Sequence, residues 1–324
     1  MTPREIIAEA WTITLREKSL RRWGIFNSLL ETLLTTKLVI YQVWFLISYL
    51  RGKPAGFFDD VIWLHQNVST VALVSIVGGF CFLLVLEWIL PNLARGAIIG
   101  LAAKAYKKEP VKGGLVLAIY NFFPLFAVHE FFFLAGFTTV LTIISLILRY
   151  VMTDLKFFMI VFIVLFWFLS NILKFLSSFA EPAIVIHRVS IFEAMGRSFR
   201  LILSYLSHVM FLWLLLFVIS IRIAFNAALV LVIPGIAFGI GFLLALFSSP
   251  VIAYSIATGV GLILILIASY FFAYLHVFKE AVWTITYFEL KKFKDLVIIE
   301  DEDEDKEKEE EKAESSGLPG AATA

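Results

Sequence analysis

Ionisable side chains inside long apolar runs are the residues of this chain with the clearest chemical consequence. They are Glu31, Lys37, Glu87, Glu130, Lys174 and Arg222. A charged group at the centre of a bilayer costs roughly 3 kcal/mol or more unless it is paired, hydrated or able to reach the surface. Such residues therefore indicate either a polar cavity within a membrane protein or the ends of its spans.

Four of these charges are expected at one depth. At a rise of about 1.5 Å per residue, Glu31, Glu87, Glu130 and Lys174 fall in the cytoplasmic half of their spans. Two asparagines share that depth, and the candidate polar cavity therefore comprises Asn27, Glu31, Glu87, Glu130, Asn171 and Lys174. The alternative, which the sequence alone favours, is that the glutamates lie at span ends and reach head groups or water. Arg222 is expected to extend outward or to pair near Pro234.

The composition requires a membrane protein. The chain has 324 residues, of which 60% are hydrophobic and 16% charged, with a mean hydropathy of +0.91. These values lie outside the range of soluble domains. Residues Glu300 to Glu314 hold 11 acids and 3 lysines, which leaves 24 basic and 15 acidic residues elsewhere. We expect an acidic, disordered cytoplasmic tail over 296–324 and a basic membrane domain over 1–295.

The apolar runs predict an all-α integral membrane protein with about six transmembrane helices. The expected spans are 24–50, 67–90, 124–151, 156–186, 205–232 and 251–275. Each has at least the roughly 20 residues that cross the hydrocarbon. A small-residue helix is expected over 92–112 and a shallow or re-entrant helix over 113–123, and Pro234 is expected to break the chain after the fifth span.

Amphipathic helices are expected on the cytoplasmic surface. Thr2 and Glu5 have capping-box spacing around Pro3, and Ser190 and Glu193 repeat that spacing before a second helix. Apolar residues then recur at intervals of three and four, with polar and basic residues opposite. Such helices are typical of a membrane interface.

The basic residues beside these helices form an expected lipid or partner surface: Arg16, Lys18, Arg21, Arg22, Lys104, Lys107, Lys108, Arg188, Arg197 and Arg200. Anionic phospholipid head groups attract such residues by about 1 kcal/mol per charge near the surface. We expect the partners to be the lipid bilayer, its anionic head groups and a membrane or cytoplasmic protein, and not nucleic acid.

The distribution of positive charge sets the orientation. Seventeen Lys and Arg residues flank one side of the spans and four flank the other. The positive-inside rule then places both termini in the cytoplasm, in a multi-pass protein of the cell (inner) membrane. The N-terminal stretch lacks the features of a cleaved signal peptide. The single cysteine, Cys81, lies in an apolar run and cannot form an intrachain disulfide.

An internal repeat is also expected. Glu9, Ala10 and Trp11 open one basic helix, and Glu193, Ala194 and Met195 open another 184 residues later. A middle copy, placed half of that interval after the first, would begin in a basic segment before the third span. The chain would then contain three units of surface helix plus two spans, at about 1–93, 94–188 and 189–295.

The runs EPAIVIHRVSIFEAMGRSFRL (181–201) and TITYFELKKFKDL (284–296) carry a resemblance. They resemble a broad family of bacterial and archaeal six-span membrane proteins, similar to the membrane domain beside some glycerophosphodiester phosphodiesterases. The most specific residues are Glu193, Ala194, Arg197, Ser198 and Arg200. A catalytic barrel would need about 250 further residues. The resemblance therefore implies an architecture over most of 1–295 and no activity.

No catalytic, cofactor or metal constellation is evident, and we expect no enzyme and no cofactor. The five histidines are scattered singly, and His129 with Glu130 lacks the second histidine of a zinc-protease helix. Two functions remain. The preferred one is a non-enzymatic protein that engages anionic lipid or a partner through its basic surface helices, in envelope organisation or assembly. The alternative is a transporter or channel for a small solute or ion that uses the Lys and Glu residues of the candidate cavity.

Overall fold

The computed structural model describes the backbone of every residue except 53–55, 57, 68 and 316–324. Within this part, side chains are not described for residues 60, 63, 64, 67, 220, 222–231, 233, 234, 238, 250, 251, 254 and 294–315. The described backbone forms helices and no strands. This confirms the predicted all-α class.

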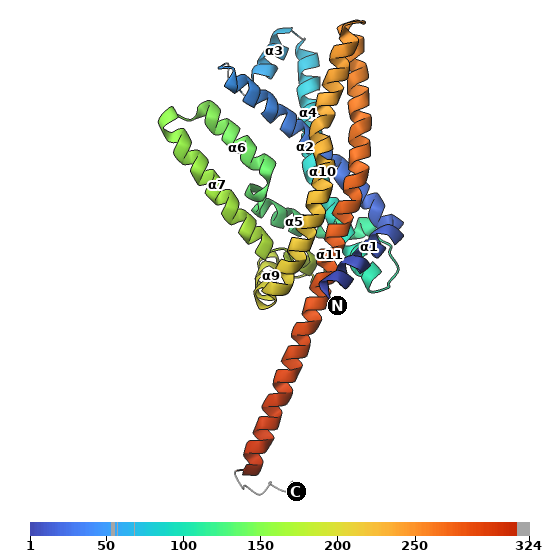
Figure 1. The fold of residues 1–324 in the computed structure, drawn as a ribbon, viewed down its shortest axis with the longest axis vertical. Coiled ribbons are helices and arrows are strands. Elements are labelled where there is room, and N and C mark those ends of the chain that lie inside the picture. The colour runs from blue at the N-terminus through green and yellow to red at the C-terminus, as the bar shows by residue number, and fades with distance from the viewer. Residues whose placement is uncertain (53–55, 57, 68, 316–324) are drawn as a thin grey trace.

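Eleven α-helices and one 3-10 helix follow each other along the described chain (Figure 1). They are α1 (Pro3–Arg16), α2 (Lys18–Leu50), α3 (Asp59–Asn67), α4 (Thr70–Tyr106), α5 (Gly114–Phe131), η1 (Phe133–Ala135), α6 (Phe137–Tyr150), α7 (Thr153–Leu176), α8 (Ala180–His187), α9 (Ile191–Ser204), α10 (Leu206–Ala245) and α11 (Pro250–Ser315).

Five helical segments are long and apolar enough to cross a membrane, and a bent pair makes up to six. The five are Lys18–Leu50, Thr70–Tyr106, Gly114–Phe131, Thr153–His187 and Ser255–Phe293. The bent pair joins Ile191–Ser204 to Leu206–Ile219 at 96°. By length and composition, these helices fit the predicted multi-pass membrane protein.

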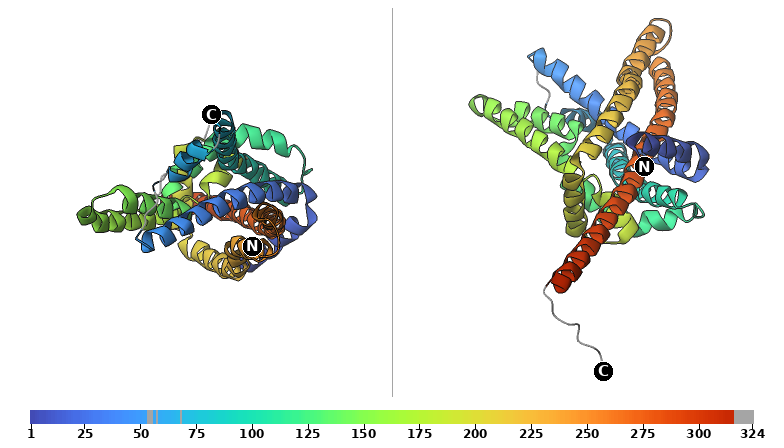
Figure 2. Two further views of the ribbon diagram at one scale, coloured as in Figure 1. Left: turned by 90° about the horizontal axis from the view of Figure 1, so that it is seen from above. Right: turned by 60° about the horizontal axis from the view of Figure 1, so that its bottom comes forward.

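The helices meet at one end of the bundle, which we call the basal end. There α1 and α9 lie across the bundle, and α11 leaves it beside the N-terminus (Figure 1). The α6–α7 hairpin splays away from the α10–α11 hairpin in all three views (Figures 1 and 2). The helices are thus packed together basally and spread apart at the other end.

The basal half of α4 is part of the core. The expected second span should end at Pro91, but α4 continues through this proline to Tyr106. A proline is tolerated in a membrane helix where neighbouring groups compensate for the lost hydrogen bond. Beyond it, Ala94, Ala97, Ile98 and Leu101 are fully buried. The small-residue helix expected over 92–112 is therefore mainly the buried end of α4.

Small residues explain this burial. A Cβ atom added to Gly96 would lie 3.3 Å from the carbonyl oxygen of Leu117 in α5, and one added to Gly100 would lie 2.8 Å from the Leu117 side chain. Small side chains permit such close approach between membrane helices. The small-residue stripe of 92–112 thus brings α4 against α5.

The expected third and fourth spans are both interrupted. α5 runs straight through Pro124, the chain breaks at η1, and α6 begins only at Phe137. In the fourth, a turn at Ser177 to Phe179 separates α7 from α8, although Thr153–His187 still forms one membrane-length segment. By contrast, α10 continues past Pro234 to Ala245, so the break predicted there is absent from the backbone.

The two predicted capping boxes have different outcomes. Thr2 and Glu5 form both hydrogen bonds of the box, as predicted. Ser190 occupies the N-cap of α9, but its side chain makes no capping hydrogen bond. Glu193 instead accepts from Arg197, at 2.6 Å between Oε1 and Nη2. The helix start was therefore predicted correctly and the capping contact was not.

Ser198 joins α9 to the break between α7 and α8. This fully buried hydroxyl accepts from the Phe179 amide at 3.0 Å and donates to the Leu176 carbonyl at 2.8 Å. It thus satisfies two backbone groups that the interruption leaves without helical partners. Ala194, one turn earlier and also fully buried, lets the same face pack closely. Two of the five most specific residues of the resemblance are therefore structural.

Replacing Ser198 by alanine should lower the free energy of unfolding by about 1–3 kcal/mol, because both backbone groups would lose their partner. Denaturant titration of the protein in mixed micelles measures this value. Ser204→Ala is the matched control on the same helix, since the hydroxyl of the exposed Ser204 donates to the Arg200 carbonyl within α9. The control should change stability by less than about 0.5 kcal/mol. Equal effects of the two variants would contradict this role of Ser198.

The acidic end of the chain continues α11, whose backbone is helical to Ser315. Side chains from residue 294 onward and the backbone of 316–324 are outside the described residues. The disordered tail expected over 296–324 remains a prediction.

Candidate functional site: a charged cluster at the basal end

Arg95 lies at the centre of an ion-pair cluster inside the basal half of the bundle. Its Nη1 atom is 3.3 Å from Oε1 of Glu181, and its Nε atom is 3.9 Å from Oε1 of Glu280. The three side chains are only 15–19% exposed. One cation of α4 is thus placed against carboxylates of α8 and α11.

Local structure accounts for these positions. Arg95 directly precedes Gly96, which lies at the close approach of α4 to α5. Glu181 is in the first turn of α8, after the interruption that follows α7. A carboxylate is favoured at a helix N-terminus, where free amide groups point toward it. The broken fourth span therefore places Glu181 at the cluster.

The Oε1 atom of Glu280 lies near two basic side chains, but both are beyond hydrogen-bonding distance. His276, one turn earlier on α11, has its Nε2 atom 3.9 Å from the same Oε1 atom of Glu280. The Arg95 Nε and His276 Nε2 atoms are buried, and neither has a hydrogen-bond partner within the described part of the chain. A separation of 3.9 Å exceeds a hydrogen bond, and a bridging water or ligand atom can satisfy both nitrogen atoms across it.

Lys174 and Glu31 complete the cluster. Lys174 interacts electrostatically with Glu181, Glu31 and Glu280, and Arg95 also interacts with Glu31. The basal charged cluster is thus Glu31, Arg95, Lys174, Glu181, His276 and Glu280, supplied by α2, α4, α7, α8 and α11. The charges that interact in this cluster come from segments far apart in the sequence.

The structure divides the predicted cavity. Glu31 and Lys174 are in the basal charged cluster, and Asn27 donates to Glu31 at 3.3 Å. The other three predicted residues, Glu87, Glu130 and Asn171, make contacts elsewhere. Asn171 donates to the Ala135 and Trp167 carbonyls, while Glu130 accepts from Trp88 at 2.9 Å and lies 3.1 Å from His129.

Glu87 forms a separate ion pair in which the carboxylate is buried and its partner Lys37 is half-buried. Its Oε1 atom is 2.6 Å from Nζ of Lys37, so α2 and α4 are joined by opposite charges. Lys37 was recognised in the sequence as a charge within the first span, but its partner could not be identified. Arg222, the other charge named there, has its side chain outside the described residues.

Sequence reasoning missed Arg95, Glu181, His276 and Glu280 as members of a site. Arg95 was counted among the cytoplasmic charges after the second span, and both glutamates fall next to expected span ends. The spacing of four between His276 and Glu280 could have placed them on one helical face. No local pattern connects either to Arg95.

The predicted basic surface lies around the basal end. Eight of its ten residues are exposed: Arg16, Lys18, Arg22, Lys107, Lys108, Arg188, Arg197 and Arg200. Arg21 is half-buried and donates to the Tyr274 hydroxyl at 3.2 Å. Lys104 is also half-buried and donates to the Lys112 carbonyl at 2.9 Å. Most of the set is therefore free to meet other molecules.

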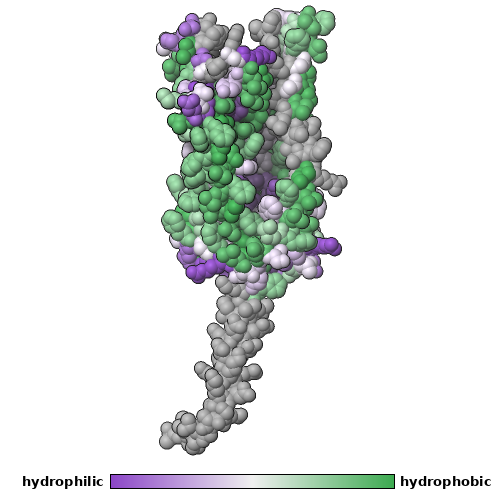
Figure 3. All heavy atoms as spheres, turned by 60° about the vertical axis from the view of Figure 1, so that its left-hand side comes forward, coloured by the Kyte–Doolittle hydropathy of each residue, from purple (hydrophilic) through white to green (hydrophobic). Residues whose placement is uncertain are grey.

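A hollow opens on the face from which α6 and α7 project. In Figure 3, hydrophilic atoms lie recessed between apolar borders partway up this face. α7 has no buried side chain, and its main neighbours are α6, η1 and α9. At its basal end, Phe175 contacts Trp213 of α10, with ring centroids 6.1 Å apart. The two helices therefore meet basally and leave their apolar faces exposed above.

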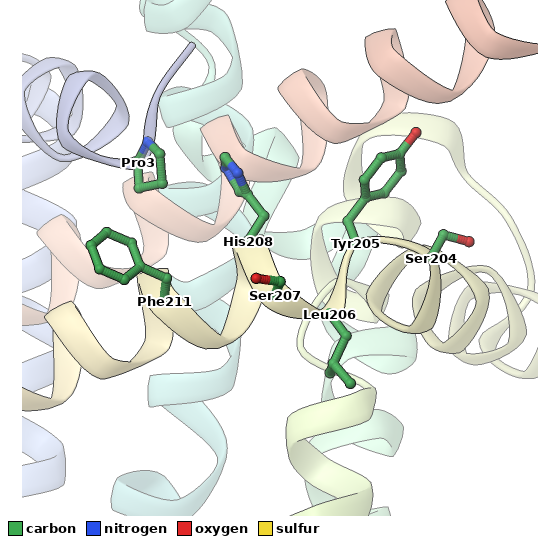
Figure 4. Close-up of a pocket in the computed structure, with 7 residues that line it drawn as sticks. All are labelled: Pro3, Ser204, Tyr205, Leu206, Ser207, His208 and Phe211. Carbon is green, nitrogen blue, oxygen red and sulfur yellow. The ribbon is translucent and has the colours of Figure 1, made fainter.

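A second hollow lies at the bend between α9 and α10. It has a volume of about 500 Å³ and is lined by Pro3, Ser204, Tyr205, Leu206, Ser207, His208 and Phe211. His208 and Phe211 extend from α10 beside Pro3 of α1 (Figure 4). The basal charged cluster contributes none of these lining residues.

Comparison with known proteins adds no relative. No family model, curated protein or solved structure matches the chain. In the part of the chain that the structure describes, no three His, Cys, Asp or Glu side chains are grouped to hold a metal ion.

Proposed function

We propose that this chain is a non-enzymatic multi-pass membrane protein that binds a charged ligand at the basal charged cluster during transport. One observation carries the proposal: α4, α8 and α11 bring three charged side chains that are only 15–19% exposed together inside an otherwise apolar bundle. Ionisable groups at such positions are costly and are typical of substrate or ion pathways.

The helix interruptions support this function. Glu181 follows the break between α7 and α8, and Lys174 directly precedes it. Membrane transporters commonly form their binding sites at discontinuous helices, where free backbone groups and helix ends face the ligand. Among the residues with described side chains, the Arg95 Nε and His276 Nε2 atoms have no hydrogen-bond partner, which further distinguishes the cluster from a closed structural ion pair.

The basic surface supports a second candidate function, binding to anionic lipid or to a partner protein. α9 lies at 96° to α10, and its Arg197 and Arg200 are exposed. A basic amphipathic helix in this orientation suits a membrane interface. We place the basal end in the cytoplasm, on the basis of the positive charge around it.

Thiol accessibility tests the transport proposal. The exposed Cys81 is first replaced by serine, and a single cysteine is then introduced as Lys174→Cys or Glu31→Cys. A charged, membrane-impermeant methanethiosulfonate is applied to both faces of open membrane fragments. Both cysteines should react, because the cluster is expected to be hydrated.

Two variants calibrate this experiment. Arg197→Cys, at an exposed position of α9, should react rapidly, and Phe162→Cys, on the exposed apolar surface of α7, should not. If Lys174→Cys and Glu31→Cys are both as unreactive as Phe162→Cys, the cluster is closed to charged ligands and the proposed function is wrong.

A further inference from the structure

We infer that the hollow at the bend between α9 and α10 binds the phosphate group of an anionic phospholipid from the leaflet at the basal end. This hollow shares no lining residue with the basal charged cluster, so the inference goes beyond the proposed transport function. It also differs from binding to a basic surface, because it assigns a defined pocket and the hydrogen-bond donors within it.

The bend lies at the depth of lipid head groups. α9 is an amphipathic helix with exposed Arg197 and Arg200, and it lies at 96° to the apolar start of α10, Leu206–Ile219. A basic amphipathic helix lies in the plane of the membrane interface, whereas an apolar span enters the hydrocarbon. The point where one continues into the other is therefore where head groups meet acyl chains.

Two side chains of the hollow are available to a ligand. The Nε2 atom of His208 is buried and has no hydrogen-bond partner among the residues with described side chains. The Ser207 hydroxyl has none either within that part of the chain. Ser204 lines the same hollow, but its hydroxyl donates to the Arg200 carbonyl at 2.8 Å. A buried polar atom without a partner is costly, and a bound ligand would remove that cost.

The backbone adds donors at the same place. α10 begins at Leu206, and Tyr205 at its N-cap makes no side-chain capping hydrogen bond. The amide groups of a first helical turn have no partner within the helix and carry a partial positive charge. The first three residues of α10, Leu206, Ser207 and His208, all line the hollow (Figure 4). Backbone and side-chain donors therefore border one space.

A phosphate matches this set of groups. Backbone amides only donate, a hydroxyl can donate, and an imidazole Nε2 atom donates in the tautomer that carries its proton there. Anions are commonly bound at helix starts that combine such donors. None of the described lining residues is acidic, and the volume of about 500 Å³ falls within the usual range of small-ligand sites. The hollow is therefore suited to an anion and not to a cation.

Nearby charges favour a lipid with a net negative charge. Arg4 directly follows the lining residue Pro3, and Arg200 lies one turn before the lining residue Ser204. Both arginines are exposed. The Glu5 carboxylate, also close in sequence, already accepts a backbone hydrogen bond in the capping box of α1. Cations near the membrane surface attract anionic lipids more than zwitterionic ones.

Apolar surface continues from the hollow along α10. Leu206, Met210 and Leu214 follow each other at a spacing of four and are 44%, 44% and 53% exposed. Residues at this spacing lie on one face of a helix, so the stripe leads from the hollow into the hydrocarbon. A phospholipid held by its phosphate can place an acyl chain along the stripe. A soluble phosphate compound would leave the stripe without a role.

Ligand-induced stabilisation of the full chain in detergent tests the inference. The ligands are dihexanoyl phosphatidylglycerol, dihexanoyl phosphatidylcholine and inorganic phosphate, each titrated at constant ionic strength. A ligand that binds only the folded state raises the unfolding temperature, and the titration gives its apparent Kd. Phosphatidylglycerol should bind about tenfold more tightly than either of the others, because it alone combines negative charge with acyl chains.

The competing ligands decide the class of compound. If phosphatidylcholine binds as tightly as phosphatidylglycerol, the site does not select an anionic lipid. If inorganic phosphate binds as tightly, the ligand is a soluble anion. Either result would overturn the inference.

Matched serine variants locate the site. Ser207→Ala and His208→Phe should each weaken the affinity for phosphatidylglycerol about tenfold, because each removes a donor to a charged group. Ser204→Ala should leave the affinity unchanged, since its hydroxyl is already engaged within α9. Unchanged affinity in both Ser207→Ala and His208→Phe would show that the lipid binds elsewhere. An equal loss in Ser204→Ala would show that the free donors do not hold the phosphate.

A variant of the basal charged cluster separates this site from the transport proposal. Lys174→Gln should retain the affinity for phosphatidylglycerol, because Lys174 does not line the hollow. Loss of binding in Lys174→Gln would place the lipid at the cluster and contradict the inference. The thiol experiment is independent of this result, since unreactive thiols at the cluster refute transport and leave lipid binding at the bend unaffected.

Discussion

Replacing Arg95 by leucine should lower the free energy of unfolding by about 3–5 kcal/mol. The variant would leave Glu181 without its 3.3 Å partner and Glu280 without the arginine 3.9 Å away, although these carboxylates are only 19% and 16% exposed. A buried charge that loses its partner must be neutralised or exposed, and either change costs stability. Unfolding by sodium dodecyl sulfate in mixed micelles measures the difference.

A surface arginine provides the control for this result. Arg197 forms a 2.6 Å ion pair with Glu193 on α9, but both side chains are 48% exposed. Such pairs contribute only about 0.3–0.5 kcal/mol, so Arg197→Leu should have a small effect. Adding Glu181→Gln to Arg95→Leu should recover part of the lost stability. If Arg95→Leu costs no more than Arg197→Leu, the cluster is not a buried ion-pair network.

The second large effect on stability is expected at the ion pair between Lys37 of α2 and Glu87 of α4. Lys37→Met should destabilise the protein by about 3–5 kcal/mol, because Glu87 would remain buried without its 2.6 Å partner. Glu87 is 4% exposed, and its second oxygen already lacks a hydrogen-bond partner among the described residues. Unfolding titrations of the two single variants measure how much the free energy of unfolding falls when either charge is removed.

The double variant separates the ion pair from general packing. Replacing a buried ion pair by apolar side chains of similar size is often neutral or stabilising. Lys37→Met combined with Glu87→Met should therefore recover most of the stability that Lys37→Met loses. A double variant whose loss equals the sum of the two single losses would show that the charges do not act as a pair.

Sequence reasoning addressed the site through the depth of charged residues in their spans. Asn27, Glu31 and Lys174 could be grouped because span depth follows from counting residues at a fixed rise per residue. Asn27 donates to Glu31, and Lys174 interacts electrostatically with Glu31, whereas a cavity shared by all six residues remains a prediction. Glu87 has a similar predicted depth, but it pairs with Lys37 instead. Depth alone does not predict which helices face each other, so this partner could not be identified from the sequence.

The caps illustrate the same distinction at a local scale. Both helix starts, after Thr2 and after Ser190, follow from residue types within one turn. The full capping box forms at Thr2, whereas Glu193 bonds to Arg197 instead of completing the box at Ser190. A local pattern thus defines where a helix starts more reliably than which of several competing partners a flexible side chain selects.

The sequence by itself determined the all-helical class, the membrane-length apolar runs, the start of α9 and the charges that need an explanation. These properties depend on composition and on periodicity along one segment. Only the tertiary structure decided that α4 continues past Pro91 into the core, that the fourth span breaks before Glu181, and that Arg95 meets carboxylates of α8 and α11. Those outcomes depend on contacts between distant segments, because the packing of one helix against another sets which breaks are tolerated and which charges find a partner.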